Sequence, residues 1–338
     1  MSRSRPGAPR APQQPVDRLP ATTHILVATE GSDGVSPEIR VARAIADLHG
    51  SKVDVLSVVV PPMPSPLVSD FGLMGAMNPS FLPAPDTGAR NVRIRDELYR
   101  AGRPNWNDTI VVGWPGEEIP AAAKRLGATM IVIGIGRHAP VDRLFGSETA
   151  LQVLQSAEIP VLAVTADLMG VPRRALASLD FSAQSETAAR VASELVADDG
   201  TLSLVHVRTD WSEPVDPQIP VDLYAAGVER RFEQLERQLT LDRLAPRTVE
   251  RIVRHGDPVH EILRVANAAD VDLIAVGART HSRVYRVLMG SVAAKLLRGS
   301  HRSVLVIPPK AEHAVPVTAT HGAQAEALPE SALAGTVP

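Results

Sequence analysis

The stretch from Leu273 to Ile307 reads LIAVGARTHSRVYRVLMGSVAAKLLRGSHRSVLVI and decides the fold. It begins with an apolar strand that ends in Gly277, continues through a polar loop to Gly290-Ser291, where a helix opens, and ends with a second apolar strand. This order of strand, helix and strand is typical of α/β proteins with a parallel sheet. Backbone N–H groups at a glycine turn and at a helix start can hold a phosphate chain, so the stretch is also a candidate anion site.

The chain contains this unit twice. Residues 131–164 carry the same order of apolar strand, Gly-Ser pair and second apolar strand. Aligning the two copies pairs Gly134 with Gly277, and the first strands of the two halves align at Glu30 and Asp180. The repeat spans the whole folded region, and a chain of 338 residues is long enough for two domains with their own cores. We therefore predict a pseudo-twofold tandem repeat of two similar domains.

Short apolar runs rich in β-branched residues alternate with helical patterns along both halves, which indicates βα units on parallel sheets. The strands that we expect in the first half are residues 25–29, 53–59, 109–112, 130–133 and 161–164, and those in the second half are residues 175–179, 202–207, 249–253, 273–276 and 304–307. The predicted fold class is therefore α/β, with two doubly wound five-stranded parallel sheets in a Rossmann-like sandwich. We expect the last strands of the two halves to pair with each other, because this satisfies their edge groups within the chain.

Two terminal segments lie outside the predicted folded unit. Residues 1–21 are rich in proline and arginine, and residues 311–338 have no aromatic residue and no helical period, so we expect both to be disordered tails. The two domains are expected at residues 22–168 and 172–310. Residues 61–86, with seven prolines and three methionines, form the largest difference between the halves. Such a long irregular segment is either disordered or a lid or partner surface, and the sequence leaves both readings open.

The net charge of −3 and the isoelectric point near 6.4 give the chain no general attraction for nucleic acid or for an anionic membrane. The chain has no cysteine, which excludes disulfides, thiolate metal sites and a cysteine nucleophile. No stretch approaches the length of a membrane span, and no apolar segment follows the N-terminal arginines as it would in a signal peptide. We therefore expect a cytoplasmic protein that binds neither nucleic acid nor membrane.

In an open parallel sheet, ligands bind beyond the carboxyl ends of the strands, where the strand order reverses. The candidate residues of the second half all fall at such ends or at the start of the last helix. A carboxylate suits ribose or the polar edge of a base, and an apolar wall suits the base itself. Glycine N–H groups, a hydroxyl and a positive charge suit phosphate. In that order, the residues are Asp180, Val207, Gly277, Gly290, Ser291 and Arg279.

With these residues in place, the chain resembles the universal stress protein family in a tandem two-domain form, over residues 22–310. ATP-binding members of that family carry a glycine, two residues, a second glycine, nine residues and Gly-Ser or Gly-Thr, with an aspartate ending the first strand. The second half keeps this spacing with Gly277, Thr280 and Gly290-Ser291, and its aspartate is Asp180; a threonine replaces the second glycine. The resemblance implies an adenine nucleotide α-hydrolase-like fold and ATP as the ligand, with or without Mg²⁺.

The first half departs further from that pattern. It carries Gly134, Gly136 and Gly146-Ser147, with one position fewer between the first glycine and the Gly-Ser pair. Holding the flanking strands in register places Glu148 where the second half has its serine. We expect this carboxylate to face the phosphate position and repel the ligand, unless the loop slips by one residue and restores the Gly-Ser placement. Glu30 takes the place of the family's aspartate. We therefore predict a weaker N-terminal nucleotide site.

The candidate residues also have structural alternatives. Gly277 and Gly290 can be a strand-end turn and a helix entry, and Asp180 can be a helix cap. His206 and His281 read as ordinary polar or core residues, and the ten histidines show no metal-type spacing. The chain has no Walker-type phosphate loop, no Gly-x-Ser-x-Gly elbow and no His-Glu-x-x-His motif, so we do not expect an enzyme.

The main functional hypothesis is a stress-response or regulatory protein that binds ATP or another adenine nucleotide, mainly in its C-terminal domain. The alternative is an interaction module of the same fold that binds no nucleotide and recognises a protein partner through residues 61–86 or the tails. Slow ATP hydrolysis stays open as a third, weaker reading. The resemblance also makes a homodimer of tandem chains plausible.

Overall fold

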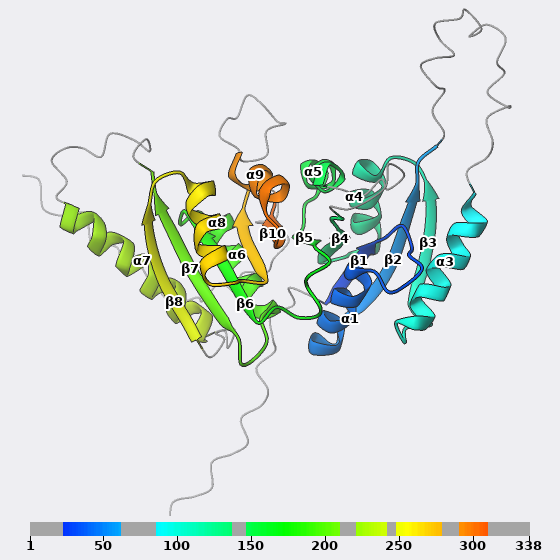
Figure 1. Cartoon of the computed structure of the whole chain (residues 1–338), viewed down its shortest axis with the longest axis horizontal. Coiled ribbons are helices and arrows are strands. Elements are labelled where there is room, and N and C mark those ends of the chain that lie inside the picture. Colours follow the sequence, from blue (N-terminus) through cyan, green and yellow to red (C-terminus); the bar gives the residue numbers. More distant parts are fainter. Residues whose placement is uncertain are drawn as a thin grey trace, which may run out of the picture.

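The computed structural model describes residues 23–61, 86–136, 147–209, 221–241, 248–278 and 291–309. The predictions for the two tails and for residues 62–85 lie outside these described residues, as do four candidate site residues: Gly146, Arg279, Thr280 and Gly290. The described part is an α/β structure in which strands and helices alternate along both halves of the chain (Figure 1). The predicted fold class is confirmed.

The ten predicted strands are all present, and each begins and ends within two residues of its predicted bounds. The strands are β1 (His24–Ala28), β2 (Lys52–Val59), β3 (Asn107–Val112), β4 (Met130–Gly134), β5 (Val161–Val164), β6 (Arg174–Leu179), β7 (Thr201–Arg208), β8 (Thr248–His255), β9 (Leu273–Gly277) and β10 (Ser303–Ile307). The helices are α1 (Pro37–His49), α3 (Thr87–Arg100), α4 (Pro115–Leu126), α5 (Ser147–Ser156), α6 (Ala183–Leu195), α7 (Val221–Leu241), α8 (Pro258–Ala268) and α9 (Ser291–Gly299).

The strands form one continuous sheet rather than two separate sheets. Their order across it is β3-β2-β1-β4-β5-β10-β9-β6-β7-β8, so each half contributes five parallel strands in mirrored order. The two halves meet where β5 and β10 pair antiparallel, with Leu305 opposite Leu162. The expected pairing of the last strands is therefore confirmed. It hides two apolar edges that would otherwise expose unpaired backbone groups.

Local signals in the sequence explain where the helices begin and end. Ser182 caps α6 by accepting a hydrogen bond from a backbone N–H (3.3 Å), and Asp257 caps α8 in the same way (2.9 Å). Gly50 and Gly127 end α1 and α4 in the left-handed conformation, which glycine adopts without steric cost. These caps fix the starts of α6 and α8 at the same edge of the sheet, beside the carboxyl ends of the strands.

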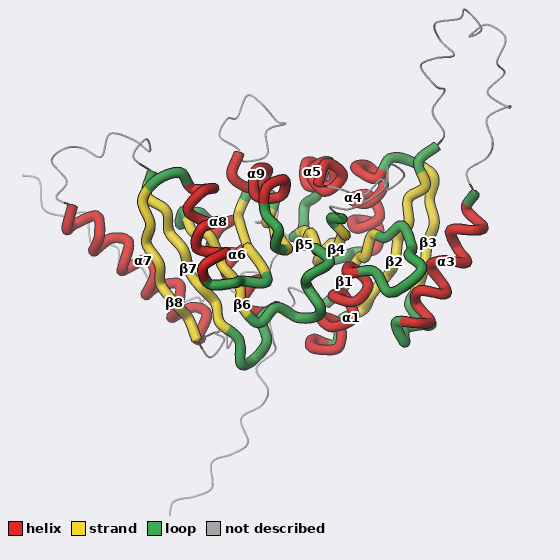
Figure 2. The backbone as a smooth tube through the Cα atoms, in the orientation of Figure 1, coloured by secondary structure: helices red, strands yellow, loops and turns green. Residues whose placement is uncertain are grey.

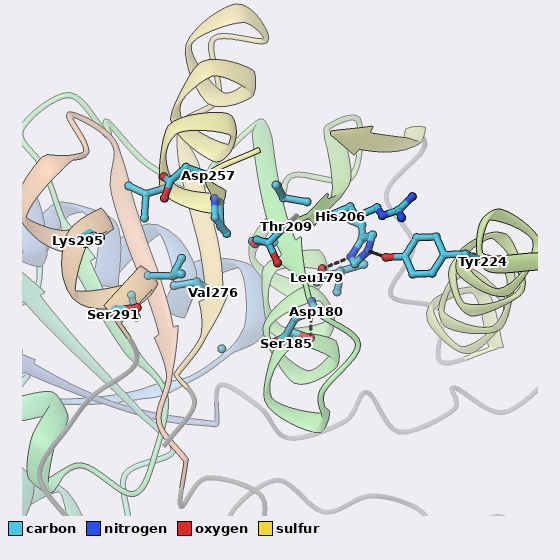
Figure 3. Close-up of a pocket in the computed structure, with 18 residues that line it drawn as sticks. Leu179, Asp180, Ser185, His206, Thr209, Tyr224, Asp257, Val276, Ser291 and Lys295 are labelled. Carbon is cyan, nitrogen blue, oxygen red and sulfur yellow. Dashed lines mark hydrogen bonds between the residues drawn. The ribbon is translucent and has the colours of Figure 1, made fainter. Parts of the chain in front are cut away.

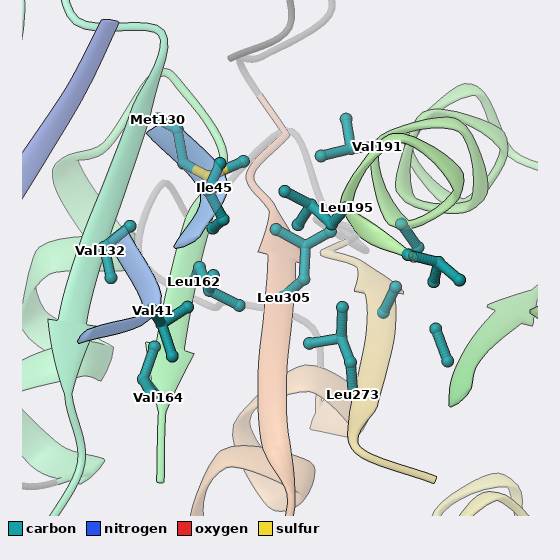
Figure 4. Close-up of a cluster of buried hydrophobic side chains, with 14 of the residues drawn as sticks. Val41, Ile45, Met130, Val132, Leu162, Val164, Val191, Leu195, Leu273 and Leu305 are labelled. Carbon is teal, nitrogen blue, oxygen red and sulfur yellow. The ribbon is translucent and has the colours of Figure 1, made fainter. Parts of the chain in front are cut away.

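Apolar side chains fill the space on both faces of the sheet. One core layer lies between the sheet and α1, α3, α6 and α7, and the other lies between the sheet and α4, α5, α8 and α9. Figure 2 shows the course of these helices and strands. The first layer runs without interruption across the junction of the halves, where Leu162 and Leu305 lie between side chains of α1 and α6 (Figure 4). Because both layers contain residues from both halves, the two domains are packed as one body.

The junction is reinforced by polar contacts as well. The Ser303 hydroxyl accepts a hydrogen bond from the backbone N–H of Thr165 (3.1 Å). Above the sheet, α5 and α9 lie side by side (Figure 1), and Arg298 donates to both carboxylate oxygens of Glu148 at 2.8 and 3.3 Å. Among the helices in the described ranges, none combines the length and apolar character that crossing a membrane requires.

Candidate functional site

A cavity of about 450 Å³ lies in the second half of the chain, at the carboxyl ends of β6, β7 and β9 (Figure 3). The first turns of α8 and α9 form its other wall. In this half the strand order reverses between β6 and β9, because successive strands run outward from β6 to β8 and then return to β9. The cavity therefore occupies the position at which open parallel sheets bind ligands.

Four of the candidate residues of the second half line this cavity: Asp180, Val207, Gly277 and Ser291. They lie at the ends of β6, β7 and β9 and at the start of α9, which are far apart in the sequence. The structure thus brings these four residues to one cavity. The other three candidates, Arg279, Thr280 and Gly290, lie between the described ends of β9 and α9.

Asp180 follows the end of β6 and is held by the residues that open α6. Its Oδ1 atom accepts hydrogen bonds from the backbone N–H of Ser182 (3.0 Å) and from the Ser182 hydroxyl (2.5 Å). Ser182, and not Asp180, is the helix cap. Phe181, between them, has a φ of +57°, which is unusual for a residue with a side chain. This turn presents the Asp180 carboxylate at the cavity wall.

Next to Asp180, the end of β7 carries a buried histidine that sequence reasoning set aside. His206 is 8% exposed and contacts the Leu179 carbonyl oxygen through Nδ1 (2.8 Å) and the Tyr224 hydroxyl through Nε2 (2.9 Å). Burial lowers the pKa of His206 below its usual value, because the charged imidazolium is poorly solvated there. All three residues line the cavity (Figure 3). Sequence alone could not pair His206 with Tyr224, since they meet only after α7 packs on the sheet.

The wall formed by α8 and α9 carries both signs of charge, with Asp257 at the start of α8 and Lys295 in the first turn of α9. Ser291 is the first residue of α9, and Lys295 lies one helical turn later, on the same side of that helix. The start of a helix favours anions through its unpaired N–H groups and its dipole. Lys295 was not predicted as a site residue, although its spacing of one turn from Ser291 was a signal that could have found it.

Gly277 has a structural role in addition to its place at the cavity. A Cβ atom at this position would lie 2.6 Å from the backbone nitrogen of Ser185 and 2.7 Å from the carbonyl carbon of Gln184. Real Cβ atoms do not approach backbone atoms so closely, so glycine is needed for α6 to pack against the end of β9. The alternative reading of this glycine, as a feature of the chain's own packing, is therefore supported alongside the functional one.

The end of β4 in the first half is packed by the start of α1, as the end of β9 in the second half is packed by the start of α6. Glu38, from the start of α1, points at the end of β4, where a Cβ atom on Gly134 would lie 2.5 Å from its Oε2. The Thr29 hydroxyl donates to the other carboxylate oxygen (2.8 Å). Burial raises the pKa of Glu38, and the nearby carboxylate of Glu97 raises it further. A buried acidic group at this point would oppose the binding of a phosphate chain.

The helices at the same end of the first half also approach more closely than their counterparts. A Cβ atom on Gly116 of α4 would lie 2.8 Å from the Cβ atom of Gln152 of α5. In the repeat alignment, Val259 of α8 and Lys295 of α9 take these two positions, and both line the cavity of the second half. In the first half, the smaller pair of Gly116 and Gln152 allows α4 and α5 to pack closely. In the second half, the larger pair of Val259 and Lys295 borders the cavity.

The remaining described candidate residues of the first half also lie after strand ends or at the start of a helix. The carbonyl oxygen of Glu30 accepts a hydrogen bond from Arg90 of α3. Gly136 is exposed, and Ser147 is the first residue of α5. The expectation that Glu148 faces the phosphate position is wrong, because its carboxylate forms the ion pair with Arg298 in the other half. The weaker N-terminal site stays a prediction, and Glu148 is not the residue that would account for it.

The chain was compared with known proteins. The model of the universal stress protein family matches residues 22–165 and again residues 172–308. A universal stress protein from Archaeoglobus fulgidus DSM 4304 is 20% identical, with a TM-score of 0.56 over 85% of this chain and 98% of that chain. A functionally unknown protein from Pseudomonas aeruginosa PAO1 is 16% identical, with a TM-score of 0.53 over 86% of this chain and 94% of that chain. No curated protein matches the chain.

These likenesses to solved structures show a shared fold, and the family model matches most of the sequence in two consecutive segments. The chain therefore belongs to the universal stress protein family and carries two domains of that family in tandem.

Proposed function

We propose that the chain binds an adenine nucleotide, with ATP as the first candidate, in the cavity of its second half, and that it acts as a non-catalytic stress-response or regulatory protein. The observation that carries the proposal is the distribution of charge around the cavity. Asp180 lies on one side, and Ser291 and Lys295 lie at the start of α9 on another. A nucleotide has a matching distribution, with hydroxyls on the ribose and negative charge on the phosphates.

The order of the strands determines the direction in which a nucleotide would lie in the cavity. Strands β9, β6 and β7 lie side by side in that order, and α9 leads into β10 next to β9. Phosphate at Ser291 and Lys295 places the ribose near Asp180 and the base near Val207. The volume of about 450 Å³ falls within the range of small-molecule sites, about 300 to 1,000 Å³. The Asp180 carboxylate can accept hydrogen bonds from ribose hydroxyls, and the Val207 side chain supplies an apolar surface.

The same geometry favours binding without catalysis. A general base needs an available lone pair within reach of the reacting group. Both ring nitrogens of His206 are engaged, one with the Leu179 carbonyl and one with the Tyr224 hydroxyl. The histidine of this cavity is therefore used to order the wall of the site.

The test is isothermal titration calorimetry of the full chain with ATP, comparing the wild-type protein with Lys295→Gln. This substitution installs the residue that the first half has at the matching position. Hydrogen bonds between charged groups contribute about 1.5 to 3 kcal/mol, so the dissociation constant should rise between about tenfold and about a hundredfold.

The control is Lys124→Gln, which makes the same charge change on α4, where Lys124 lies 3.7 Å from Glu158 on the surface of the first half. This variant should bind ATP as the wild type does. Absence of heat and of retention at millimolar ATP in the wild-type protein would reject the proposal. An equal loss in the two variants would reject the role of Lys295 and leave only a general charge effect.

The filled first half favours a second candidate function for that domain. Glu38 occupies the end of β4, and Glu97 of α3 accepts hydrogen bonds from the backbone N–H groups of Ser32 (3.0 Å) and Ser36 (2.7 Å). A domain packed in this way by its own side chains suits an interaction module that contacts a protein partner. In this proposal the chain acts in the cytoplasm, as a homodimer of tandem chains. Unchanged thermal melting of the whole chain in the presence of ATP would favour this function for both halves.

A further inference from the structure

The end of β7 holds a chain of three hydrogen-bonding groups at the cavity wall (Figure 3). His206 joins the Leu179 carbonyl oxygen at 2.8 Å to the Tyr224 hydroxyl at 2.9 Å. The ring of Phe181 packs on the imidazole at a centroid distance of 4.9 Å, and the guanidinium of Arg208 lies 4.7 Å from the centre of the Tyr224 ring. The imidazole of His206 and the ring of Tyr224 are thus each packed against a further side chain, and this packing restricts the direction of their hydrogen bonds.

The position of each proton in this chain follows from the chemistry of its first member. A carbonyl oxygen can only accept, so Nδ1 of His206 must carry a hydrogen and donate it to Leu179. Burial of the ring favours the neutral imidazole, in which Nε2 then has only a lone pair. The Tyr224 hydroxyl must therefore donate its single hydrogen to Nε2. The Tyr224 oxygen can then only accept a further hydrogen bond.

Tyr224 lines the cavity beside the end of β7, which is the end that the proposed function assigns to the base. Phosphate at α9 and ribose at β6 place the base at β7, because β7 lies on the far side of β6 from β9. The pairing between β6 and β7 ends at Leu179 and His206, whereas β7 continues to pair with β8 as far as Arg208. Strand β7 therefore extends past its neighbour at the place where the base would lie.

We infer that Tyr224, oriented by His206, reads the base, and that the cavity selects a purine with an amino group at C6 over one with a carbonyl group there. This inference rests on the proposed function and deepens it. A 6-amino group donates a hydrogen bond to the Tyr224 oxygen. A 6-carbonyl group would bring two acceptors together and leave both unpaired, and an unpaired buried polar group is strongly disfavoured.

The pair of His206 and Tyr224 is not repeated in the first half. In the repeat alignment Ser57 takes the position of His206, one residue after Leu56, which pairs with the end of β1. Ser57 is fully buried, and its short side chain cannot replace the two-sided contact of an imidazole. The tyrosine–histidine pair is thus present in the second half, where it lines the cavity described above.

The test measures ATP and ITP, which differ at C6 of the purine, by calorimetry on the full chain. Wild-type protein should bind ATP between about ten and about a hundred times more tightly than ITP. Tyr224→Phe removes the acceptor and should bring the ratio close to one by weakening ATP. His206→Ser should also lower the ratio, but by strengthening ITP, because the Tyr224 hydroxyl is then able to donate its hydrogen to the carbonyl.

The control is Tyr99→Phe, which removes the same atom from a side chain that is 74% exposed on α3, and it should leave the ratio unchanged. Thermal melting followed by circular dichroism shows whether each variant is folded. Equal wild-type affinity for the two nucleotides would overturn the inference while leaving the proposed function standing, as would a ratio that survives in a folded Tyr224→Phe. A wild-type protein that binds neither nucleotide would overturn both.

Discussion

At the scale of single residues, Glu38 is a buried acidic group beside the candidate residues of the first half. Its carboxyl group is buried at the end of β4, where the second half presents a cavity wall. Burial disfavours the charged form, so the pKa of Glu38 is raised above its ordinary value of 4.5. The hydrogen bond from Thr29 works in the other direction but does not cancel the effect of burial.

This shift predicts a stability that depends on pH. Because the folded protein holds the Glu38 proton more tightly than the unfolded chain, stability falls as pH rises from 4.5 through the raised pKa in the folded state. Glu38→Gln keeps the shape and removes the titration. Its melting temperature should match that of the wild type near pH 4 and exceed it increasingly up to pH 8. Differential scanning calorimetry over this range checks the prediction, with exposed Glu233→Gln as the control. A difference that stays constant with pH would contradict it.

The candidate site could be predicted from the sequence only where spacing carries the information. Asp180, Val207 and Ser291 follow strand ends or open a helix, and such positions converge in any parallel sheet. His206 and Tyr224 could not be found in this way, because their contact depends on how α7 packs across the sheet. The packing of Glu38 against the end of β4 could not be predicted either, since it depends on the direction in which this side chain points.

At the scale of elements, the approach of α6 to β9 decides how tightly the sheet and its helices pack at the site. Strand bounds were predictable because apolar runs end where the backbone leaves the sheet. Neither the apolar pattern of a strand nor that of a helix gives the distance at which the two elements pack. Gly277 therefore read as a phosphate-binding glycine or a turn, and the structure adds that its missing side chain makes room for the start of α6.

Gly277→Ala should destabilise the protein by about 1 to 3 kcal/mol, because the added methyl group meets backbone atoms of Ser185 and Gln184 that cannot move aside alone. Gly136→Ala is the matched control: it lies just after β4 in the other half, and no described atom comes within 4 Å of its added Cβ. Urea unfolding monitored by circular dichroism measures both variants. If Gly277→Ala were as stable as the control, the close packing of α6 on β9 would be disproved.

At the scale of the whole molecule, the two halves share one fold but differ in the residues that pack at the candidate sites. The antiparallel contact of β5 with β10 joins two parallel halves into one sheet, and the core layers cross that junction. The pairing of the last strands could be predicted, because repeats of one unit bury their edges against each other. A difference between the two halves was also predicted from motif spacing, but contacts such as that of Gly116 with Gln152 could not be, since these residues meet only in the folded protein.

This asymmetry predicts that one chain binds one nucleotide. The first half opposes a second ligand through the buried Glu38 carboxyl at β4 and through the contact of Gly116 with Gln152, whereas Val259 and Lys295 border a cavity in the second half. Calorimetric titration with ATP should give a stoichiometry close to one per chain. Amide hydrogen exchange should slow at the ends of β6 and β9 and in the first turn of α9, and should stay unchanged at the end of β4 and in α1. Two nucleotides per chain, or protection of α1 by ATP, would show that the first half opens to the ligand in solution.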